Sequence, residues 1–330
     1  TGVSPVTMDD VTSGFNIGTN ITTDPWFNDL VGFSGKELRE MLTYYKEQGA
    51  LPMSVDDAVT MMKPNYDNYC FSKNKLADCM FNSDMVLYCM KSLILHGVKP
   101  DEIVDPNIRT DFNKLAYLVR LDHGLGENFS VIKEIAEQGE IVTEIVTHFS
   151  ALEMTDVGNF KSLLFYFGLL SIKGVDMMGR PILHIPNLVV REQLFNFLIQ
   201  GYARHDIFKL DVNRLRTLFE NMSFKGDWKP LFEFLAEAIR EQSRIREYIE
   251  GEAHIKGFLL AYLSMFRYYQ LYPEYEMNKG FADFFFKPSP AAPVSPPYTY
   301  LLEVKYAKAG ASEKEIRALA DDAREQLIRY

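Results

Sequence analysis

Three ionisable residues near the end of the chain lie in unusually apolar stretches. Asp283 precedes three consecutive phenylalanines, and Glu303 and Lys305 are separated only by Val304. Ionised groups set among apolar side chains are costly unless they are paired or hold a metal. Two carboxylates can bind a hard divalent cation, and an amine beside them can act on a water molecule. These residue types therefore predict metal-assisted hydrolysis.

Strands are expected to position these side chains. The apolar runs 272–286 and 300–306 flank a proline-rich loop at 287–297, a pattern that predicts a hairpin. Because alternate residues of a strand share a face, Glu303 and Lys305 should point to the same side. Glu276, on the strand before Asp283, either approaches the same site or lies in solvent.

The arrangement resembles the PD-(D/E)xK nucleases, the restriction-endonuclease-like superfamily. Asp283 corresponds to the Asp of that motif, Glu303 to its second acid and Lys305 to its lysine, while Ala282 replaces the usual Pro. The resemblance implies that Asp283, Glu303 and the carbonyl of Val304 hold Mg²⁺ or Mn²⁺. It further implies phosphodiester hydrolysis, in which Lys305 orients or deprotonates the attacking water.

Two predicted helices flank these strands. On the first, 245–269, Glu252 lies on the apolar stripe, where a carboxylate needs a partner. It either pairs with Lys256, one turn later, or is a further metal ligand, as in many members of the superfamily. The last helix begins at a capping box, Ser312-Glu-Lys-Glu315.

The last helix also carries Gln326 and Tyr330, which are spaced i, i+4 and so share one face. This pair matches the Gln-x-x-x-Tyr element of one branch of the superfamily. The resemblance implies that Gln326 positions water or phosphate and that Tyr330 donates to a phosphate. The alternative is a solvated helix end.

A second resemblance covers about residues 1–200. It is carried by the opening Thr-Gly-Val-Ser-Pro run, by Asp24-Pro-Trp-Phe-Asn28, by Gly32-Phe33 and by Tyr66-Asp-Asn-Tyr69. These motifs resemble the latter half of the AAA-ATPase-like domain of bacterial proteins that end in such a nuclease. The resemblance implies that Thr1–Ser4 end a strand that senses nucleotide phosphates.

The sequence contains no G-x-x-x-x-G-K-[S/T] phosphate loop, since Gly35-Lys36 lacks both the earlier Gly and the Ser/Thr. We therefore expect no ATP hydrolysis by this chain alone, and ATP as a ligand only of an intact protein. The start at Thr1 without a Met suggests a fragment, and the nuclease resemblance implies at least one more strand after the last helix. Such a fragment lacks the phosphate-loop half and the last nuclease strand.

The region between these resemblances is predicted to be mainly helical. Ser34-Gly-Lys-Glu37 is a capping box that begins a helix ending near Gly49. At about 155–202, a helix, a hairpin around Gly174–Gly179 and a second helix suggest a winged-helix-like unit. Its hairpin carries only Lys173 and Arg180 as bases, so a structural role is favoured over DNA binding.

Composition limits the function classes. The 330 residues are 47% hydrophobic and carry a net charge of −10, which argues against a protein coated in nucleic acid. The charge is uneven, about −1 over 235–330 and −9 elsewhere, so the C-terminal part could face a phosphate backbone with little opposing field. No apolar run is long enough to span a membrane, and we expect no signal peptide. Three cysteines without a C-x-x-C pair predict reduced thiols and a cytoplasmic setting.

Together these features predict a mainly α chain with a C-terminal α/β unit. Residues 1–50 are expected to be a remnant of an AAA-ATPase-like core, 51–235 a helical lid and 236–330 a nuclease-like mixed sheet flanked by helices. The predicted function is metal-dependent cleavage of DNA or RNA coupled to an ATPase region. The alternative is a catalytically silent binding or regulatory module with the same fold. The sequence leaves open the type of nucleic acid, whether the site is active and the oligomeric state.

Overall fold

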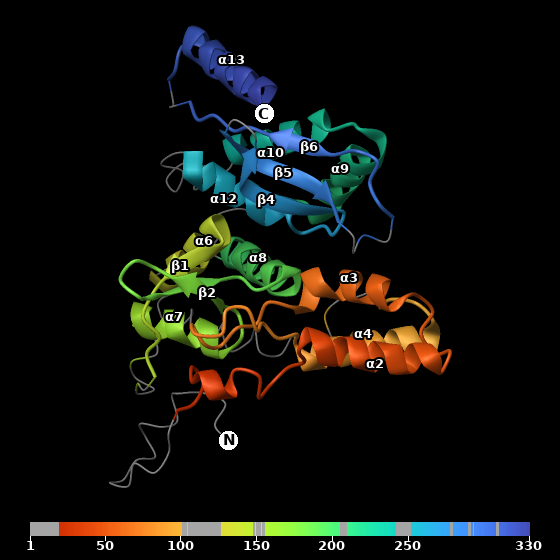
Figure 1. Cartoon of the computed structure of the whole chain (residues 1–330). Helices are drawn as coiled ribbons and strands as arrows, with labels where there is room; N and C mark the ends of the chain where they lie inside the picture. The colour runs from red at the N-terminus through yellow and green to blue at the C-terminus, as the bar shows by residue number, and fades with distance from the viewer. Residues whose placement is uncertain are drawn as a thin grey trace. The chain divides into compact units, whose positions relative to one another are not determined.

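The structure is a computed structural model (Figure 1), and it describes residues 20–100, 104, 127–147, 149, 153, 156–204, 210–241, 252–277, 280–289, 292, 294–307 and 310–330. The chain divides into two compact units, 1–197 and 198–330. This division lies within a helix and N-terminal to the predicted boundary at 235/236. The expected phosphate-sensing strand at Thr1–Ser4 and the start of the predicted 245–269 helix lie outside the described residues.

In the first unit, the described residues from position 20 onward form a short 3₁₀ helix, η1 (Pro25–Phe27), followed by the α-helices α2 (Gly35–Glu47), α3 (Val55–Tyr66) and α4 (Ser83–His96). The Ser34–Glu37 capping box is present, so that prediction is confirmed. The apolar sides of α2, α3 and α4 form one core, which includes Leu38, Leu42, Ala58, Met62, Val86 and Leu93. Burial of these side chains holds the three helices together.

Two isolated antiparallel bridges tie the α3–α4 connection in place. Phe33 pairs with Phe81, and Tyr69 pairs with Met80. Asn28 supports the same connection, because its buried side chain accepts hydrogen bonds from the backbone of Phe71 and donates one to the carbonyl of Asp78. The connection is therefore built by long-range backbone pairing and is not part of a regular sheet.

The rest of the first unit contains a three-stranded antiparallel sheet with the order β1-β3-β2. Its strands are β1 (Glu140–Val142), β2 (Ser171–Val175) and β3 (Pro181–His184), and its helices are α6 (Glu127–Gln138), α7 (Val157–Tyr166) and α8 (Leu188–Arg204). The helix–hairpin–helix order predicted for 155–202 is observed as α7, β2, β3 and α8. The sequence did not predict β1, which is only three residues long. Whether this part functions as a winged helix stays a prediction.

The described residues of the second unit include the end of α8 and the helices α9 (Val212–Lys225), α10 (Lys229–Glu241), α12 (Glu252–Leu263) and α13 (Glu313–Arg329). Gly226 ends α9 in a left-handed conformation with φ of 75°, which a residue with a side chain adopts only at a cost. α9 packs by Phe219 against Phe266 and Tyr269, and Tyr300 donates a hydrogen bond to the carbonyl of Met222.

The sheet of the second unit has the strand order β4-β5-β6, and both pairings are antiparallel. β4 spans Tyr269–Met277, β5 spans Gly280–Pro288 and β6 spans Tyr300–Leu302. The prediction of a mixed sheet is wrong for the described strands. Consecutive strands joined by a tight turn or a hairpin loop must run antiparallel, whereas a parallel pair needs a longer crossover.

No helix among the described residues is long and apolar enough to cross a membrane.

In α13 the Ser312–Glu315 capping box is present, as predicted. This helix has no fully buried residue, and its half-buried positions follow one line: Leu319, Ala323, Gln326, Leu327 and Tyr330. α13 is therefore attached to the unit along one narrow face.

Candidate active site

The two faces of β5 differ sharply in character. Ala282, Phe284 and Phe286 alternate along one face and are almost completely buried in the core. On the other face Phe281 is 56% exposed, yet Asp283 is only 5% exposed. Asp283 is thus a buried carboxylate on the face of the strand that points away from the hydrophobic core, where it needs polar partners.

The strand register brings Glu303 opposite Asp283. β5 pairs with β6 through Phe285 with Leu301 and Phe284 with Leu302, so Asp283 and Glu303 occupy the next position of the same register. Residues directly opposite each other share a face of the sheet, and two like charges placed there repel each other. The fold therefore places the two predicted acids together at a position that calls for a cation.

β6 is shorter than predicted, because regular strand structure ends at Leu302 and not at Tyr306. The backbone N–H of Val304 donates a hydrogen bond of 2.6 Å to Oδ2 of Asp283. That amide is engaged by the Asp283 side chain and is not available for a regular ladder hydrogen bond. Side chains still alternate in direction beyond the end of β6, because Glu303 and Lys305 contact each other on the same side.

The Glu303 carboxyl is buried and incompletely partnered. Its side chain is 5% exposed, and its Oε2 atom is buried without a hydrogen-bond partner. Burial raises the pKa of this carboxyl above its ordinary value, and the nearby Asp283 charge raises it further, while Lys305 opposes the change. An unpartnered buried oxygen next to a second carboxylate is an observation that fits a missing cation.

Lys305 connects Glu303 to α13. Its Nζ lies 3.2 Å from Oε1 of Glu303 and 3.3 Å from Oδ2 of Asp322, and it donates a 2.7 Å hydrogen bond to Oε1 of Gln326. Burial, the largest single effect, lowers the pKa of the ammonium, but the contacts with Glu303 and Asp322 outweigh it and raise the pKa overall. The charged form of Lys305 is therefore favoured in this structure.

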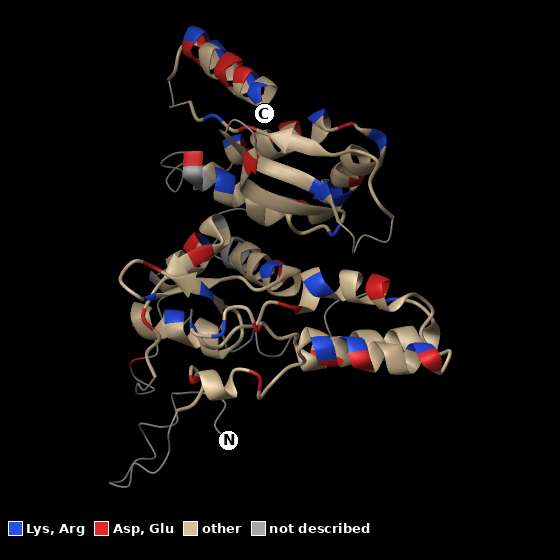
Figure 2. Cartoon of the chain, viewed as in Figure 1, with Lys and Arg blue, Asp and Glu red and all other residues tan. Residues whose placement is uncertain are grey.

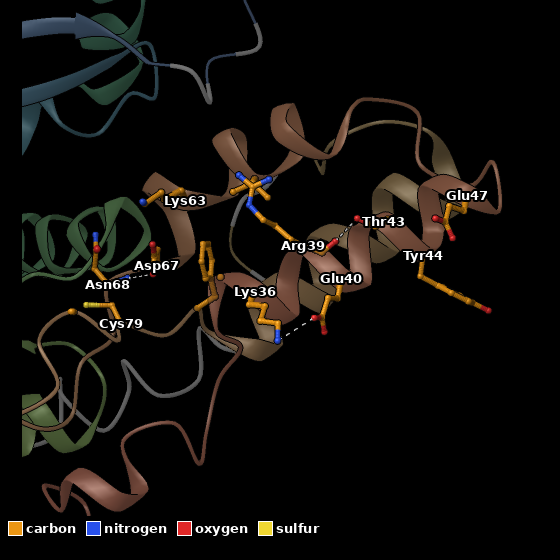
Figure 3. Close-up of a pocket in the computed structure, with 14 residues that line it drawn as sticks. Lys36, Arg39, Glu40, Thr43, Tyr44, Glu47, Lys63, Asp67, Asn68 and Cys79 are labelled. Atoms are coloured by element: carbon orange, nitrogen blue, oxygen red, sulfur yellow. Dashed lines mark hydrogen bonds and ion pairs between the residues drawn. The ribbon is translucent and has the colours of Figure 1, made fainter.

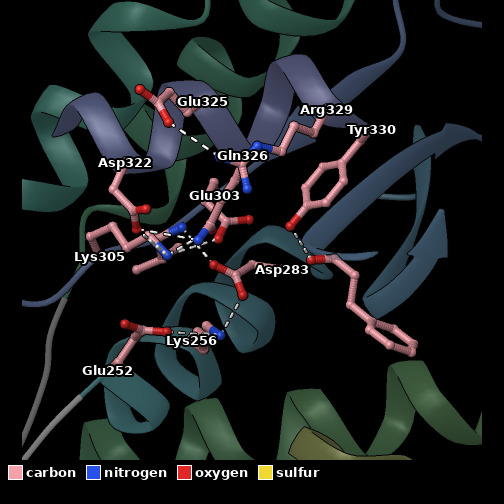
Figure 4. Close-up of polar contacts among 12 residues, drawn as sticks. Glu252, Lys256, Asp283, Glu303, Lys305, Asp322, Glu325, Gln326, Arg329 and Tyr330 are labelled. Atoms are coloured by element: carbon pink, nitrogen blue, oxygen red, sulfur yellow. Dashed lines mark hydrogen bonds and ion pairs between the residues drawn. The ribbon is translucent and has the colours of Figure 1, made fainter. Parts of the chain in front are cut away.

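A second lysine reaches the site from α12. The Lys256 ammonium forms an ion pair with Oδ1 of Asp283 and lies 3.0 Å from Oε1 of Glu252 (Figure 4). The structure thus gives Glu252 the Lys256 partner that its position on the helix suggested. The same lysine connects Glu252 to Asp283, and the role of Glu252 as a further metal ligand stays a prediction.

The Gln326–Tyr330 pair contacts Lys305 and the first residues of β5. Gln326 receives the Lys305 hydrogen bond and donates one of 3.2 Å to Asp322, and the Tyr330 hydroxyl donates one of 2.6 Å to the carbonyl of Phe281. A Cβ added at Gly280 would lie 2.8 Å from the Tyr330 ring. The absence of a side chain at Gly280 is therefore what lets Tyr330 approach the strand.

Two contacts at this site were not predicted from the sequence. Asp322, which contacts Lys305, is four residues before Gln326, so the spacing 322, 326, 330 along one helix face could have revealed it. The contact of Lys256 with Asp283 depends on how α12 meets the sheet and had no local signal. Glu276, the other acid weighed at this site, is exposed.

The residues present fit a divalent cation only in part. Asp283 and Glu303 supply hard oxygen ligands, and Oε2 of Glu303 has no other partner. Within the described residues there is no group of three or more His, Cys, Asp or Glu side chains positioned to hold a metal. A cation here would therefore rest on two carboxylates, with the Val304 carbonyl as the predicted third protein ligand, and would compete with Lys256 for Asp283.

Comparison with known proteins agrees with this geometry. Residues 250–330 match the family model of the PD-(D/E)XK nuclease superfamily, and they contain every element that forms the site. No curated protein and no solved structure matches the chain. The C-terminal part of the chain is thus a PD-(D/E)XK nuclease superfamily domain, and the assignment of the preceding residues to an AAA-ATPase-like region stays a prediction.

Proposed function

We propose that the second unit is a metal-dependent nuclease that hydrolyses phosphodiester bonds in DNA or RNA. One observation carries the proposal: continuing the β5–β6 register puts Asp283 opposite Glu303, and Oε2 of Glu303 is buried without a hydrogen-bond partner. The family match supports a nuclease superfamily domain in the same residues. Nucleic acid is the substrate class that this family implies.

Asp283, Glu303 and the carbonyl of Val304 are the groups that would hold Mg²⁺ or Mn²⁺. When bound, such an ion would polarise a phosphate oxygen and favour deprotonation of a nearby water molecule. The N–H of Val304, which donates to Asp283, orients that carboxylate. Burial of Glu303 favours binding of a cation, because the ion would relieve both the desolvation and the repulsion from Asp283.

Lys305 is the proposed acid–base and charge-stabilising residue. It lies beside Glu303 and contacts Gln326 and Asp322 of α13. Contacts from both the segment after β6 and the helix α13 therefore fix its position. An ammonium in this place can offset the negative charge that develops on a phosphate in the transition state. Gln326 is proposed to position Lys305 and a water or phosphate, and Tyr330 is proposed to donate to a phosphate after leaving the Phe281 carbonyl.

A catalytically silent module is the second candidate, and one contact favours it. The Lys256 ammonium already neutralises Asp283 and bridges it to Glu252. If this ion pair is stronger than the interaction of Asp283 with a metal ion, the fold persists without catalysis. The two candidates therefore differ in whether a divalent cation displaces Lys256 from Asp283.

The proposal is tested by metal-dependent cleavage of a panel of single- and double-stranded DNA and RNA. Glu303→Gln should abolish cleavage and weaken Mn²⁺ binding, because it removes one of two carboxylate ligands. Lys305→Met should fold and bind metal nearly as the parent does but cleave roughly 10²-fold more slowly, the scale usual for a positioned acid–base group. Lys287→Met is the matched control on an exposed position of β5 and should cleave normally.

Two results would count against the nuclease. Equal cleavage by the parent and Lys305→Met proteins would remove Lys305 from the mechanism. Absence of Mn²⁺ binding in calorimetry, together with no cleavage of any substrate when metal and ATP are present, would favour the silent module.

We infer further that residues 1–235 belong to an AAA-ATPase-like region that controls the nuclease. The support is the set of sequence motifs between residues 1 and 69, together with the α7–β2–β3–α8 order, which is compatible with a winged-helix-like part of a lid. Because the sequence contains no phosphate loop, calorimetry with this chain should detect no micromolar ATP binding. Tight binding of ATP would contradict the assignment of these residues to the part beyond the phosphate loop.

A further inference from the structure

The α3–α4 connection of the first unit brings two cysteines to opposite positions of a backbone pairing. Tyr69 and Met80 exchange both hydrogen bonds, with N···O distances of 3.1 and 2.8 Å. In an antiparallel pairing the positions next to such a pair are not hydrogen-bonded to each other, and their side chains lie closer together. Continuing the Tyr69–Met80 register by one residue places Cys70 opposite Cys79.

The expected backbone spacing suits a disulfide. Opposite residues at a non-hydrogen-bonded position have Cα atoms about 4.5 Å apart, and disulfides span Cα separations of roughly 4.4–6.8 Å. The interaction between the two thiols also shifts the pKa of both, which agrees with this register. The pair thus has the backbone placement that a bond between the sulfurs requires.

The two thiols differ in access. Cys70 is completely buried, and its Sγ donates to the carbonyl of Ser72 at 3.2 Å. Cys79 is half-buried and lines an open cavity of about 930 Å³ beside α2 (Figure 3). A small reagent can therefore reach Cys79 before it reaches Cys70.

Their ionisation differs in the same sense. The hydrogen bond with Cys70 lowers the pKa of the Cys79 thiol and outweighs burial and the nearby Asp67 and Asp78 charges, and Lys63 assists. The same hydrogen bond, together with burial, raises the pKa of Cys70. Because the thiolate is the reactive form, Cys79 is the better nucleophile of the two.

We propose that Cys70 and Cys79 form a reversible disulfide, a site of oxidation by low-molecular-weight disulfides. The Cys79 thiolate attacks one sulfur of the small disulfide, which forms a mixed disulfide and releases the first small thiol. Cys70 then attacks the Cys79 sulfur, and the second small thiol leaves. The two cysteine thiols lose two electrons and two protons, and the small disulfide gains them as two thiols.

The disulfide would strengthen a junction within the first unit. The Cys70 carbonyl accepts a hydrogen bond from the N–H of Ile172, and the Cys70 N–H donates to the hydroxyl of Ser171. Cys70 is therefore the point at which the α3–α4 connection is joined to β2. A covalent bond to Cys79 would close the connection at that point and restrict its opening.

Cys89, the third thiol of the chain, is not expected to take part in this reaction. It is buried in α4, and burial raises the pKa of its thiol to about 11. It should therefore not react with the same reagent in the folded protein. Because Cys79 and Cys89 share one tryptic peptide, 76–91, the experiment is best done in the Cys89→Ala background.

The test is peptide mapping of the full Cys89→Ala chain after treatment with oxidised glutathione. Trypsin cleaves after Lys73 and Lys75, so a Cys70–Cys79 bond would join two separate peptides. We expect this linked pair to be the main product, to disappear on reduction and to be absent in Cys79→Ala, which removes only a half-buried thiol. Retained circular dichroism would show that both variants fold.

Either of two results would overturn the proposal. The first is a stable glutathione adduct on Cys79 without the linked peptides, which would show that Cys70 cannot reach it. The second is no modification of Cys79 in the folded chain. Neither result depends on nucleic-acid cleavage, so this test is independent of the nuclease assays.

Discussion

Helices α2 and α13 begin in the same way but are held in the molecule differently. Ser34 and Ser312 each form a complete capping box, in which the serine N–H donates to the glutamate three residues later at 2.8 and 2.7 Å. The local signal that starts a helix is therefore equal in the two. The difference between them lies in the side chains beyond the cap.

α2 is held by hydrophobic packing, whereas α13 is held by polar contacts. Leu38 and Leu42 of α2 are completely buried, but no residue of α13 is. Charged residues of both signs follow α13 along its length (Figure 2). Asp322, Gln326 and Tyr330 join this helix to the rest of the unit by polar contacts, all at the candidate site. Polar groups at the candidate site therefore attach α13, whereas a hydrophobic core attaches α2.

The largest expected difference between the two helices is in apolar truncation. Leu42→Ala should lower the free energy of unfolding of the first unit by about 3 kcal/mol, because it leaves a cavity in a closed core. Leu327→Ala, at a half-buried position of α13, should lower that of the second unit by less than about 1 kcal/mol. Urea unfolding combined with hydrogen exchange of each helix measures both. Equal losses would show that α13 is packed as tightly as α2.

Loss of either cap should destabilise its own helix equally, but only loss of the α2 cap should lower the free energy of global unfolding. Ser34→Ala and Ser312→Ala should each cost about 1 kcal/mol of helix stability. In α2 this loss should appear in global unfolding, because the helix belongs to the core. In α13 it should appear only as faster amide exchange of the helix itself. A loss of global stability in Ser312→Ala that matches Ser34→Ala would contradict this difference.

The Tyr330 contact measures how α13 is attached. Tyr330→Phe removes the hydrogen bond to the Phe281 carbonyl and should weaken the docking of α13 by about 1 kcal/mol. Gly280→Ala should act in the same place, because its Cβ would meet the Tyr330 ring. Amide exchange across α13 reports both, and Ile328→Ala, at an exposed position, is the control. Unchanged exchange in Tyr330→Phe would mean that the other contacts of the helix suffice.

Acidification should affect the caps and the site in opposite senses. Hydrogen bonds to the serines of the caps lower the pKa of Glu37 and Glu315. Their contribution to folding stability is therefore present above pH 4.5 and is lost as pH falls through the lowered pKa. Burial raises the pKa of Glu303, so its contribution to folding stability is present below pH 4.5 and is lost as pH rises through the raised pKa.

The measurement is the change in unfolding free energy with pH for Glu303→Gln and Glu37→Gln, without added metal. Relative to the parent, Glu303→Gln should become more stabilising as pH rises through the raised Glu303 pKa. Glu37→Gln should become more destabilising as pH rises through the lowered Glu37 pKa. The same sign for both variants would show that Glu303 is stabilised by its partners more than it is destabilised by burial.

Features that depend on neighbours in the chain were determined by the sequence itself. The two capping boxes, the common side of Glu303 and Lys305 and the common face of Gln326 and Tyr330 all follow from backbone geometry within about four residues. The nuclease motif was recognisable for the same reason, since its acid–x–lysine spacing is local. The length of β6 was not, because a side chain from another strand engages the amide of Val304.

Contacts between distant segments were decided only by the tertiary structure. Strand register, and not spacing, sets Asp283 opposite Glu303 and Cys70 opposite Cys79. Helix packing brings Lys256 to Asp283, and a strand end brings Lys305 to Asp322. A shift of one residue in either strand pairing would move Asp283 or Cys70 away from its partner. Such contacts depend on how whole elements meet, which no short stretch of the sequence contains.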